Sequence, residues 1–459
     1  MQLLYKGDSR VVKIIKKKTL RPGARYRLSR FVCSYPADGQ IILRSSLSKQ
    51  IYALDTAEWE ALNTDALAEE DRNELAHARF LVEKEYDEFA QYMMVFSALR
   101  SMDIPSPGIS SYTILPTTAC NARCVYCYEE GVKPVNMTLK TADAVVDFIL
   151  RTKAEGEIRL SWFGGEPLLG ASVISHICGA LGEKGVVYSS SVTTNGTLLT
   201  AEMAQEAREL WHLNRVQVSM DGTRSDYAAR KNYSNPARFN YDTAMKSIEL
   251  FSGTGAFVVV RCNYDNGNLP GMNEFFTDCR DRFGNAENIR IYMAPLFQTV
   301  VENGEDNIYL NAADAERELG KTGLALEGGL ELRLRHQYCM ADSSTDSVII
   351  DPSGGLHFCE HYIDDDPIGS VFSDSVPLWP NPPSTVADIC KDCCFLPDCT
   401  PFRRTGCPVK PANCRAMTSV KSEQYLHDFL RRYVAEGSGQ IDSVEDEKPG
   451  KDSRRNDLC

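Results

Sequence analysis

Between residues 110 and 293 the chain alternates short apolar runs with stretches that place apolar side chains at helical spacing. The expected strands are Tyr112–Leu115, Ile158–Phe163, Val186–Thr194, Val216–Met220, Phe257–Asn263 and Ile289–Met293. The clearest helical stretches between them are Thr141–Arg151, Ala201–Glu209 and Tyr241–Ser252. Such alternation builds a parallel sheet or barrel with helices outside. Six units are fewer than a closed eight-fold barrel needs, so we predict an α/β fold with a partial (β/α)6 TIM-like barrel over residues 106–320.

A small mixed unit is expected before the barrel, over residues 1–105. Its predicted strands are Phe31–Ser34, Ile41–Arg44 and Gln50–Leu54, with a turn at residues 37–39. Thr56 is expected to cap a helix, and a second helix is expected around Ala66–Ala78.

The C-terminal part, residues 321–435, is rich in cysteine and in turn residues. It has few periodic runs between Cys339 and Cys414, so an apolar core is insufficient and bound metal must supply stability. A last helix is expected at Ser422–Ala435. The polar stretch 436–459 is expected to be disordered.

Composition narrows the function classes. A formal net charge of −13 argues against nucleic-acid binding, which needs a surplus of Lys and Arg on some face. No apolar stretch reaches the length of a membrane span and no signal peptide is evident, so we expect a cytoplasmic protein. In a reducing compartment the 16 cysteines are better metal ligands than disulfide partners. Cys33, Cys178, Cys262 and Cys279 stand alone and are expected to be small buried apolar residues.

Cys120, Cys124 and Cys127 give the spacing C-x3-C-x2-C directly after the first expected barrel strand. The thiolates therefore lie on a loop at the C-terminal edge of the sheet, where parallel α/β folds place their active sites. Three thiolates leave one iron of a 4Fe–4S cluster without a protein ligand. A catalytic metal site needs such an open coordination position. A structural zinc site would instead need a fourth Cys or His, and none is adjacent in the sequence.

This motif resembles that of the radical S-adenosylmethionine (SAM) superfamily. The resemblance implies SAM as cosubstrate, with its amino and carboxylate groups chelating the open iron. It also implies that an electron from the reduced cluster cleaves SAM to methionine and a 5′-deoxyadenosyl radical, which abstracts hydrogen from the substrate. No catalytic side chain is assigned beyond the cluster ligands. An electron donor such as flavodoxin or ferredoxin is a further expected partner.

Residues at the ends of other expected barrel strands also resemble the SAM-binding elements of this superfamily. Residues 162–167, Trp-Phe-Gly-Gly-Glu-Pro, resemble the GGEP element that binds the amino group of SAM. Two glycines allow close backbone approach and a carboxylate or carbonyl can accept from an ammonium, although such a tetrapeptide can also be a simple turn. By resemblance, Ser219 and Arg230 are candidates for carboxylate or ribose contacts, although the usual His-Asp here reads Ser225-Asp226. The implied cosubstrate contacts are Tyr126, Gly164, Gly165, Glu166, Pro167, Asn195, Ser219 and Arg230.

The second cysteine set has the pattern C-x14-G-x4-C followed by C-x2-C-x5-C. It resembles the SPASM (twitch-type) extension, which holds two auxiliary 4Fe–4S clusters in peptide-modifying radical enzymes. The resemblance gives the distal, closed cluster four ligands: Cys390, Cys393, Cys399 and Cys414. The nearer cluster takes Cys339, Cys359 and Cys407, although seven residues precede Cys407 where the family usually has three.

No cysteine follows Cys339 in residues 340–345, so the nearer cluster lacks a fourth protein thiolate or is completed by Cys394, His357 or an aspartate. An open iron there could bind a substrate cysteine thiolate and accept the electron released as a C–S bond forms.

The N-terminal pattern resembles the winged-helix leader-recognition domains of enzymes that modify ribosomally made peptides (RiPP maturases). The alternative for this unit is a barrel cap without a binding role. We therefore expect a precursor peptide as the substrate. The expected reaction is formation of a cross-link, with a Cys thioether as the favoured bond. The alternatives are a sulfatase-maturating type of enzyme that oxidises Cys or Ser to formylglycine, and an iron–sulfur electron carrier.

Overall fold

The computed structural model describes thirteen segments of the chain, and all structural statements concern these segments. They are residues 2–5, 25–37, 39–48, 50–102, 108–127, 129–296, 308–326, 346–360, 363–375, 377, 386, 388–394 and 396–398. The chain divides into two compact units, with a boundary at residues 104 and 105. The region 321–435 contributes to both units, because residues 344–380 belong with the barrel and residues from 381 onward belong with the N-terminal part.

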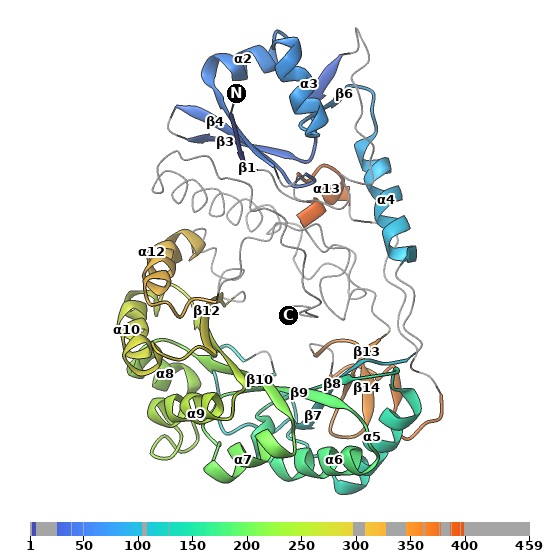
Figure 1. The fold of residues 1–459 in the computed structure, drawn as a ribbon, viewed down its shortest axis with the longest axis vertical. Coiled ribbons are helices and arrows are strands. Elements are labelled where there is room, and N and C mark those ends of the chain that lie inside the picture. Colours follow the sequence, from blue (N-terminus) through green and yellow to red (C-terminus); the bar gives the residue numbers. More distant parts are fainter. Residues whose placement is uncertain are drawn as a thin grey trace. The chain divides into compact units, whose positions relative to one another are not determined.

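The larger unit is built on a nine-stranded sheet of order β12-β11-β10-β9-β8-β7-β13-β14-β15 (Figure 1). Its first six strands in chain order are β7 (Ser111–Thr117), β8 (Ile158–Gly164), β9 (Tyr188–Thr194), β10 (Leu213–Met220), β11 (Phe257–Tyr264) and β12 (Ile289–Pro295). Every neighbouring pair among these six is parallel. The predicted α/β class with a mostly parallel sheet is therefore confirmed.

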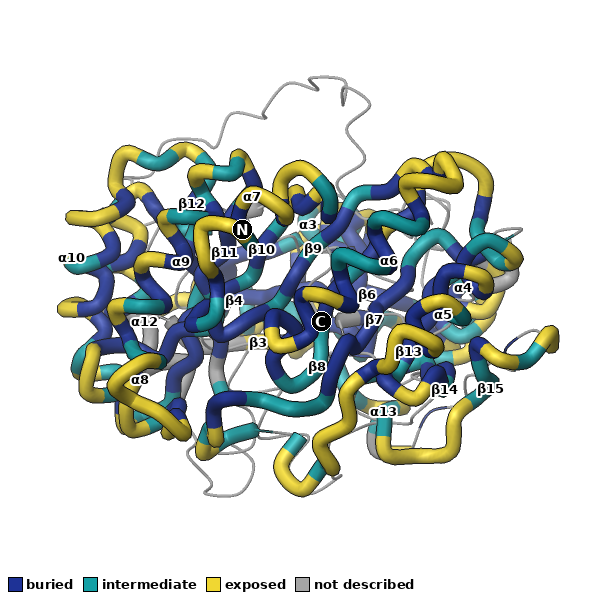
Figure 2. The backbone as a smooth tube through the Cα atoms, turned by 90° about the horizontal axis from the view of Figure 1, so that it is seen from below, coloured by how far each residue is buried: buried dark blue, intermediate teal, exposed yellow. Residues whose placement is uncertain are grey.

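Helices cover one face of this sheet (Figure 1). They are α5 (Leu139–Thr152), α6 (Ala171–Glu183), α7 (Ala201–Glu209), α8 (Arg224–Lys231), α9 (Tyr241–Gly253), α10 (Met272–Phe283) and α12 (Ile308–Lys321), with 3-10 turns η1 (Pro167–Gly170) and η2 (Leu269–Gly271). Side-chain caps at Thr138, Thr200 and Asn240 begin α5, α7 and α9 by accepting from the third helical N–H. Figure 2 shows the resulting pattern, with strands and inward helix faces buried and outer turns exposed.

Three short strands extend the sheet beyond β7: β13 (Ser347–Ile350), β14 (Gly355–His357) and β15 (Gly369–Ser370). β13 pairs parallel with β7, and β14 returns antiparallel to β13. The turn between them requires glycine at position 354, where φ is +90° and a Cβ would lie 2.7 Å from Val371 Cγ2.

The smaller unit contains an antiparallel sheet of order β1-β5-β4-β3. Its strands are β1 (Gln2–Tyr5), β3 (Val32–Ala37), β4 (Gln40–Ser45) and β5 (Ile51–Asp55), and β2 (Tyr26–Leu28) pairs separately with β6 (Leu81–Glu83). Its described helices are α2 (Thr56–Asn63), α3 (Glu69–His77), α4 (Glu88–Met102), α13 (Asp388–Lys391) and the 3-10 turn η4 (Leu396–Asp398). None of the described helices in either unit is long and apolar enough to cross a membrane.

Two expectations for this unit are wrong in detail. The cap of α2 is Asp55 rather than Thr56, because the Asp55 carboxylate accepts from Glu58 N–H while the Glu58 side chain accepts from Asp55 N–H. Helix α3 begins at Glu69 and not at Ala66, since the segment before it is a turn that leads to an extended Ala68. The expected helix at Ser422–Ala435 and the tail 436–459 lie outside the described residues.

We predict that Phe251→Ala destabilises the barrel unit. Phe251 lies on the sheet-facing side of α9 and is fully buried, so its truncation should lower the free energy of unfolding by about 3–5 kcal/mol. The measurement is the urea midpoint followed by circular dichroism. Val187→Ala is the matched control, because Val187 is 64% exposed and its truncation should change stability by about 0.5 kcal/mol or less. Equal midpoints for the two variants would contradict the described core.

Candidate active site

The cysteine loop, residues 120–127, leaves the C-terminal end of β7 and is folded tightly on itself. Cys127 N–H donates to Cys124 O at 3.1 Å, and Ala122 N–H donates to Cys120 Sγ at 3.4 Å. All three thiols are partly exposed and lie near enough to interact electrostatically. Among the described residues, no three Cys, His, Asp or Glu side chains converge closely enough to hold a single metal ion.

Burial dominates the chemistry of these thiols. Burial, together with the negative charges of Glu166, Cys124 and Cys127, raises the pKa of Cys120 to about 12, although the hydrogen bond from Ala122 N–H opposes this shift. Burial likewise raises the pKa of Cys124 and of Cys127. As thiolates these groups therefore need bound cations close by. The iron ions of an iron–sulfur cluster supply that positive charge, and such a cluster fits a donor set of three thiols on one loop.

The loop is held by the C-terminal end of α8. Arg123 N–H donates to Lys231 O at 2.9 Å, and Val125 N–H donates to Arg230 O at 3.1 Å. The last carbonyls of a helix have no partner within the helix, so they are free to bind an incoming loop. Two backbone contacts thus fix the part of the loop between the first and last cysteines.

The Gly-Gly-Glu-Pro segment packs directly against the start of the loop. A Cβ at position 164 would lie 2.3 Å from Thr117 O, and one at position 165 would lie 2.5 Å from Ala119 O. Gly164 also has φ +110°, which other residues adopt rarely. Both glycines therefore permit a close approach of β8 to the start of the loop, a structural role that the sequence analysis did not assign to them. Pro167 is buried at the first position of η1.

Glu166 has a structural contact set that the sequence did not reveal. Its carboxylate is fully buried and accepts from Thr194 Oγ1 at 2.7 Å, Asn195 N at 2.8 Å and Leu168 N at 3.1 Å. These bonds tie the end of β8 to the end of β9. Three of the positions at which the carboxylate can accept are filled from within the chain, which leaves the backbone of this segment as the better partner for a ligand ammonium.

Asn195 connects the end of β9 to the cysteine loop. Its Nδ2 donates to Asn121 Oδ1 at 2.8 Å and lies 4.0 Å from Cys120 Sγ, while its Oδ1 accepts from Thr197. The structure thus brings Asn195 to the first cysteine, at the strand edge where the sequence placed it.

Arg230 is engaged within the chain. Its guanidinium forms a two-point ion pair with the carboxylate of Asp265, at 2.9 Å for one of the contacts. Ser219 is half-buried in β10, next to Arg261 of β11 in the register. The predicted SAM contacts of Arg230 and Ser219 stay predictions.

Sequence reasoning missed a buried polar group that lies under the loop. Asp221 Oδ1 accepts from the Tyr126 hydroxyl at 2.5 Å, and its Oδ2 lies 3.2 Å from Lys231 Nζ. Asn263 Nδ2, at 3.2 Å from each, contacts both the Tyr126 oxygen and Asp221 Oδ1. Tyr126 was predicted only as an adenine neighbour. No sequence signal connected Lys231 or Asn263 to the site, because they come from α8 and β11.

The sheet face without helices is polar along the central strands. Ser161 and Ser191 hydroxyls lie 3.0 Å apart across β8 and β9, and Tyr292 OH donates to Gln217 Oε1 at 3.1 Å. On the helix side, Leu160 and Trp162 of β8 and Val216 and Val218 of β10 are buried. The half-exposed polar row on the other face is a suitable surface for a polar substrate.

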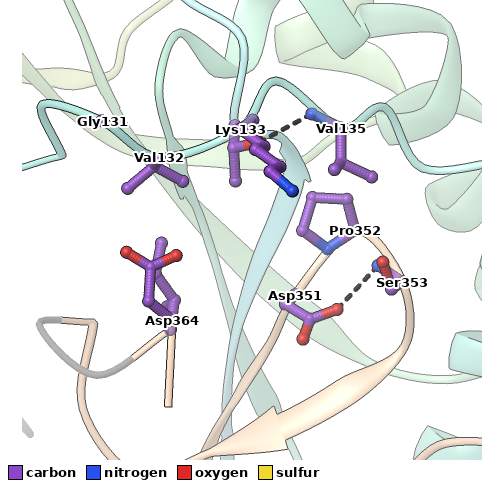
Figure 3. A pocket seen from close by; sticks show the side chains of 10 residues that line it. Gly131, Val132, Lys133, Val135, Asp351, Pro352, Ser353 and Asp364 are labelled. Carbon is purple, nitrogen blue, oxygen red and sulfur yellow. Dashed lines mark hydrogen bonds between the residues drawn. The ribbon is translucent and has the colours of Figure 1, made fainter.

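A cavity of about 300 Å³ opens beside the loop, between residues 131–135 and the β13–β14 turn (Figure 3). Asp351 lines it and accepts from Ser353 N–H at 2.6 Å and from His357 Nε2 at 2.9 Å. Burial alone would raise the pKa of Asp351, but these hydrogen bonds hold it below its usual range. His357, one candidate for completing the nearer auxiliary cluster, is therefore already bonded to Asp351.

The auxiliary cysteines are described only in part. Cys359 is buried just after β14, which runs from the edge that bears the cysteine loop toward the opposite edge. Cys390 and Cys393 lie on one turn in the smaller unit, where Cys393 N–H donates to Cys390 O at 3.2 Å. The other predicted ligands lie outside the described residues: Cys339, Cys399, Cys407 and Cys414.

Cys33 departs from its predicted role. It is buried, as expected, but its Sγ lies 2.7 Å from that of Cys394. The contact joins β3 to a segment more than 350 residues later, so no local pattern could reveal it. Cys394 is thus placed beside Cys33 in the smaller unit. Cys178, Cys262 and Cys279 are buried, as predicted.

The comparisons with known proteins agree with this geometry. Residues 114–272 match the family described as the radical SAM superfamily. A probable GTP 3′,8-cyclase from Methanococcus maripaludis is 33% identical over 259 residues, which span 55% of this chain and 80% of that protein. An uncharacterised protein from Methanocaldococcus jannaschii is 25% identical over 265 residues, spanning 55% of this chain and 85% of that protein. The chain belongs to the radical SAM superfamily and is an enzyme.

Solved structures show the same fold. The structure described as native anSMEcpe with bound AdoMet and Kp18Cys peptide aligns with a TM-score of 0.52 at 15% identity, over 71% of this chain and 98% of that one.

Some other curated relatives match over a shorter span: the chain covers 45% of a probable GTP 3′,8-cyclase from Methanopyrus kandleri, with 37% identity over 150 residues. Membership of the radical SAM superfamily implies SAM and one 4Fe–4S cluster as the cofactors of this enzyme. The assignment of Cys120, Cys124 and Cys127 as the ligands of that cluster stays a prediction.

We predict that replacing Cys120, Cys124 and Cys127 together by Ala abolishes SAM cleavage. Without these thiolates the cluster has no ligands on the loop, while cysteines elsewhere are unchanged. The measurement is 5′-deoxyadenosine formed by anaerobically reconstituted, dithionite-reduced protein. Cys178→Ala, a buried cysteine in α6, is the control and should retain cleavage. Formation of 5′-deoxyadenosine by the triple variant would show that this site assignment is wrong.

Proposed function

We propose that this protein is a radical SAM maturase that cross-links a ribosomally made precursor peptide by forming a Cys thioether. The observation that supports it best is the extension of the barrel sheet by β13 and β14. This hairpin pairs with β7, the strand that leads to the cysteine loop, and it ends in the buried Cys359. A metal-binding extension is thereby joined to the radical-forming core through a continuous sheet.

The turn that bears Cys390 and Cys393, in the smaller unit, supports a second metal site in the C-terminal part of the chain. Its two cysteines lie one helical turn apart, both partly exposed, and the backbone hydrogen bond between them fixes their spacing. With the remaining cysteines of the set they form the proposed ligands of two auxiliary 4Fe–4S clusters. The ligand assignment is the one implied by resemblance: Cys390, Cys393, Cys399 and Cys414 for one cluster, and Cys339, Cys359 and Cys407 for the other.

The electron balance explains why auxiliary clusters suit a cross-link. Joining a carbon to a cysteine sulfur removes one hydrogen from each, which is a two-electron oxidation of the peptide. SAM cleavage removes one hydrogen atom, so a second electron and a proton must leave as the bond forms. Iron–sulfur clusters bound in the extension supply the acceptor for that electron.

The sheet face supports a polar, extended substrate. The half-exposed serine, glutamine and tyrosine side chains on strands β8 to β12 present donors and acceptors beneath the cysteine loop. In the smaller unit β3 is an edge strand of its sheet, and a leader segment could pair along it as an added strand. anSMEcpe, which has a similar fold, was solved with both AdoMet and a peptide bound.

Two other reactions are alternatives to this proposal. One is formylglycine formation, which the sequence analysis also considered, and the other is GTP cyclisation, which the names of curated relatives suggest. Oxidation of Cys or Ser to formylglycine uses the same balance of two electrons and the same extension. The relatives named as probable GTP 3′,8-cyclases favour a nucleotide substrate instead. Three arginines on the sheet strands, Arg215, Arg261 and Arg290, are half-buried and could bind an anionic group.

We predict that co-expression with a precursor peptide encoded beside this protein yields a peptide lighter by two hydrogens per cross-link. Mass spectrometry with fragmentation locates the bond, and alkylation shows loss of the free thiol. A precursor with its cysteines changed to serine is the control and should stay unmodified. A peptide aldehyde without a cross-link would favour formylglycine formation, and conversion of GTP by the reduced enzyme would favour cyclisation; either result would replace the proposal.

We predict that Cys359→Ala separates SAM cleavage from peptide modification. The variant should still cleave SAM in the absence of peptide, because Cys359 lies at the far end of β14 from the cysteine loop. It should lose at least tenfold in peptide modification, since the electron acceptor would be impaired. The measurement compares 5′-deoxyadenosine with modified peptide in one reaction, and Cys178→Ala is the control. Equal loss of both products would mean that Cys359 serves only the fold.

A further inference from the structure

A complete ion pair is buried directly under the cysteine loop. Lys231, the last residue of α8, is 2% exposed, and its partner Asp221 is 0% exposed. Their charged atoms lie 3.2 Å apart. Removing two charges from water is expensive, and apolar residues of similar size would often serve stability equally well. A purely structural role therefore explains the position poorly.

The pair is joined to the loop through Tyr126, which stands between Cys124 and Cys127. Lys231 Nζ donates to the Tyr126 oxygen at 3.1 Å and lies 5.6 Å from the centre of its ring. The Tyr126 hydroxyl in turn donates to Asp221 at 2.5 Å. The backbone carbonyl of the same lysine accepts from Arg123 of the loop, so one residue supplies both an anchor and a positive charge.

The surroundings keep this lysine charged. Burial by itself would lower the pKa of Lys231, but the Asp221 carboxylate together with Tyr126, Cys124 and Tyr227 holds that pKa well above its usual range. Tyr227 lies on another side, with its ring centre 5.8 Å from Nζ, and Asn263 completes the polar shell of the Tyr126 oxygen. Arg230, the adjacent cation, is neutralised by its ion pair with Asp265.

Both charges act close to the cysteine loop. Lys231 and Asp221 each contact the hydroxyl of Tyr126, which stands between Cys124 and Cys127 in the sequence. Because the surroundings are buried, such charges are screened less than they would be in water. A change of charge at the loop therefore interacts with both groups, with opposite sign.

We propose that Lys231 is a positioning residue that sets the reduction potential of the 4Fe–4S cluster on the cysteine loop, with Asp221 as its counter-charge. Reduction adds one negative charge to the cluster, and a fixed buried cation stabilises that state. Lys231 would thus raise the potential and Asp221 would lower it, while the Tyr126 bridge holds both beside the cysteine loop. This inference rests on the cluster of the radical SAM core and is independent of the peptide substrate proposed above.

The test is a redox titration of the reconstituted enzyme followed by electron paramagnetic resonance. Lys231→Met should shift the midpoint potential of the loop cluster to more negative values, and Asp221→Asn should shift it to more positive values. The double variant Lys231→Met/Asp221→Asn should lie between the two single variants, since the two charges act with opposite sign. Lys246→Met, at an exposed position of α9, is the control and should leave the potential unchanged.

Two results would overturn the proposal. The first is a wild-type potential in Lys231→Met, and the second is a shift of the same sign in Lys231→Met and Asp221→Asn, which would indicate loosened packing. If Lys231→Met does not retain the cluster, Asp221→Asn decides alone: a shift to more negative values, or none, refutes the proposal. Failure of peptide modification with these potentials as expected would concern only the proposed function.

Discussion

The fold depends on one constraint: a loop of three cysteines must be held rigidly at the edge of a parallel sheet while its thiols stay partly accessible. The chain meets this constraint from two sides. Glycines at the end of β8 allow its backbone to approach Thr117 and Ala119 at distances that exclude a Cβ. From the other side, the last carbonyls of α8 accept from the loop backbone. These contacts use main-chain groups, so the loop is anchored without the side chains of its cysteines.

Buried charge is concentrated in the same place. Glu166 is fully buried but accepts from three donors that join β8 to β9, and the Asp221–Lys231 pair is fully buried beneath Tyr126. Each group would be strongly destabilising without its partners. Their concentration around the loop shows that this edge is organised for electrostatics as well as for packing.

Much of the barrel could be predicted because its elements are local. Each of the six core strands was placed to within a few residues, since the alternation of apolar strands and amphipathic helices has a period that single segments reveal. The short strands β13 to β15 were missed, because strands of two to four residues have too little pattern and form only by pairing with β7. The cap of α2 was misplaced by one residue, as Asp55 and Thr56 are both good cap residues.

The sequence by itself determined the α/β class, the cysteine loop, the glycines beside it and the superfamily, because each depends on residue types at short, fixed spacings. Only the tertiary structure decided which distant residues meet there. Lys231 reaches Tyr126 across 105 positions, and Cys33 meets Cys394 across 361. It also assigned Glu166 to a bond network between strand ends. Such contacts follow from strand order and helix packing, which no local spacing encodes.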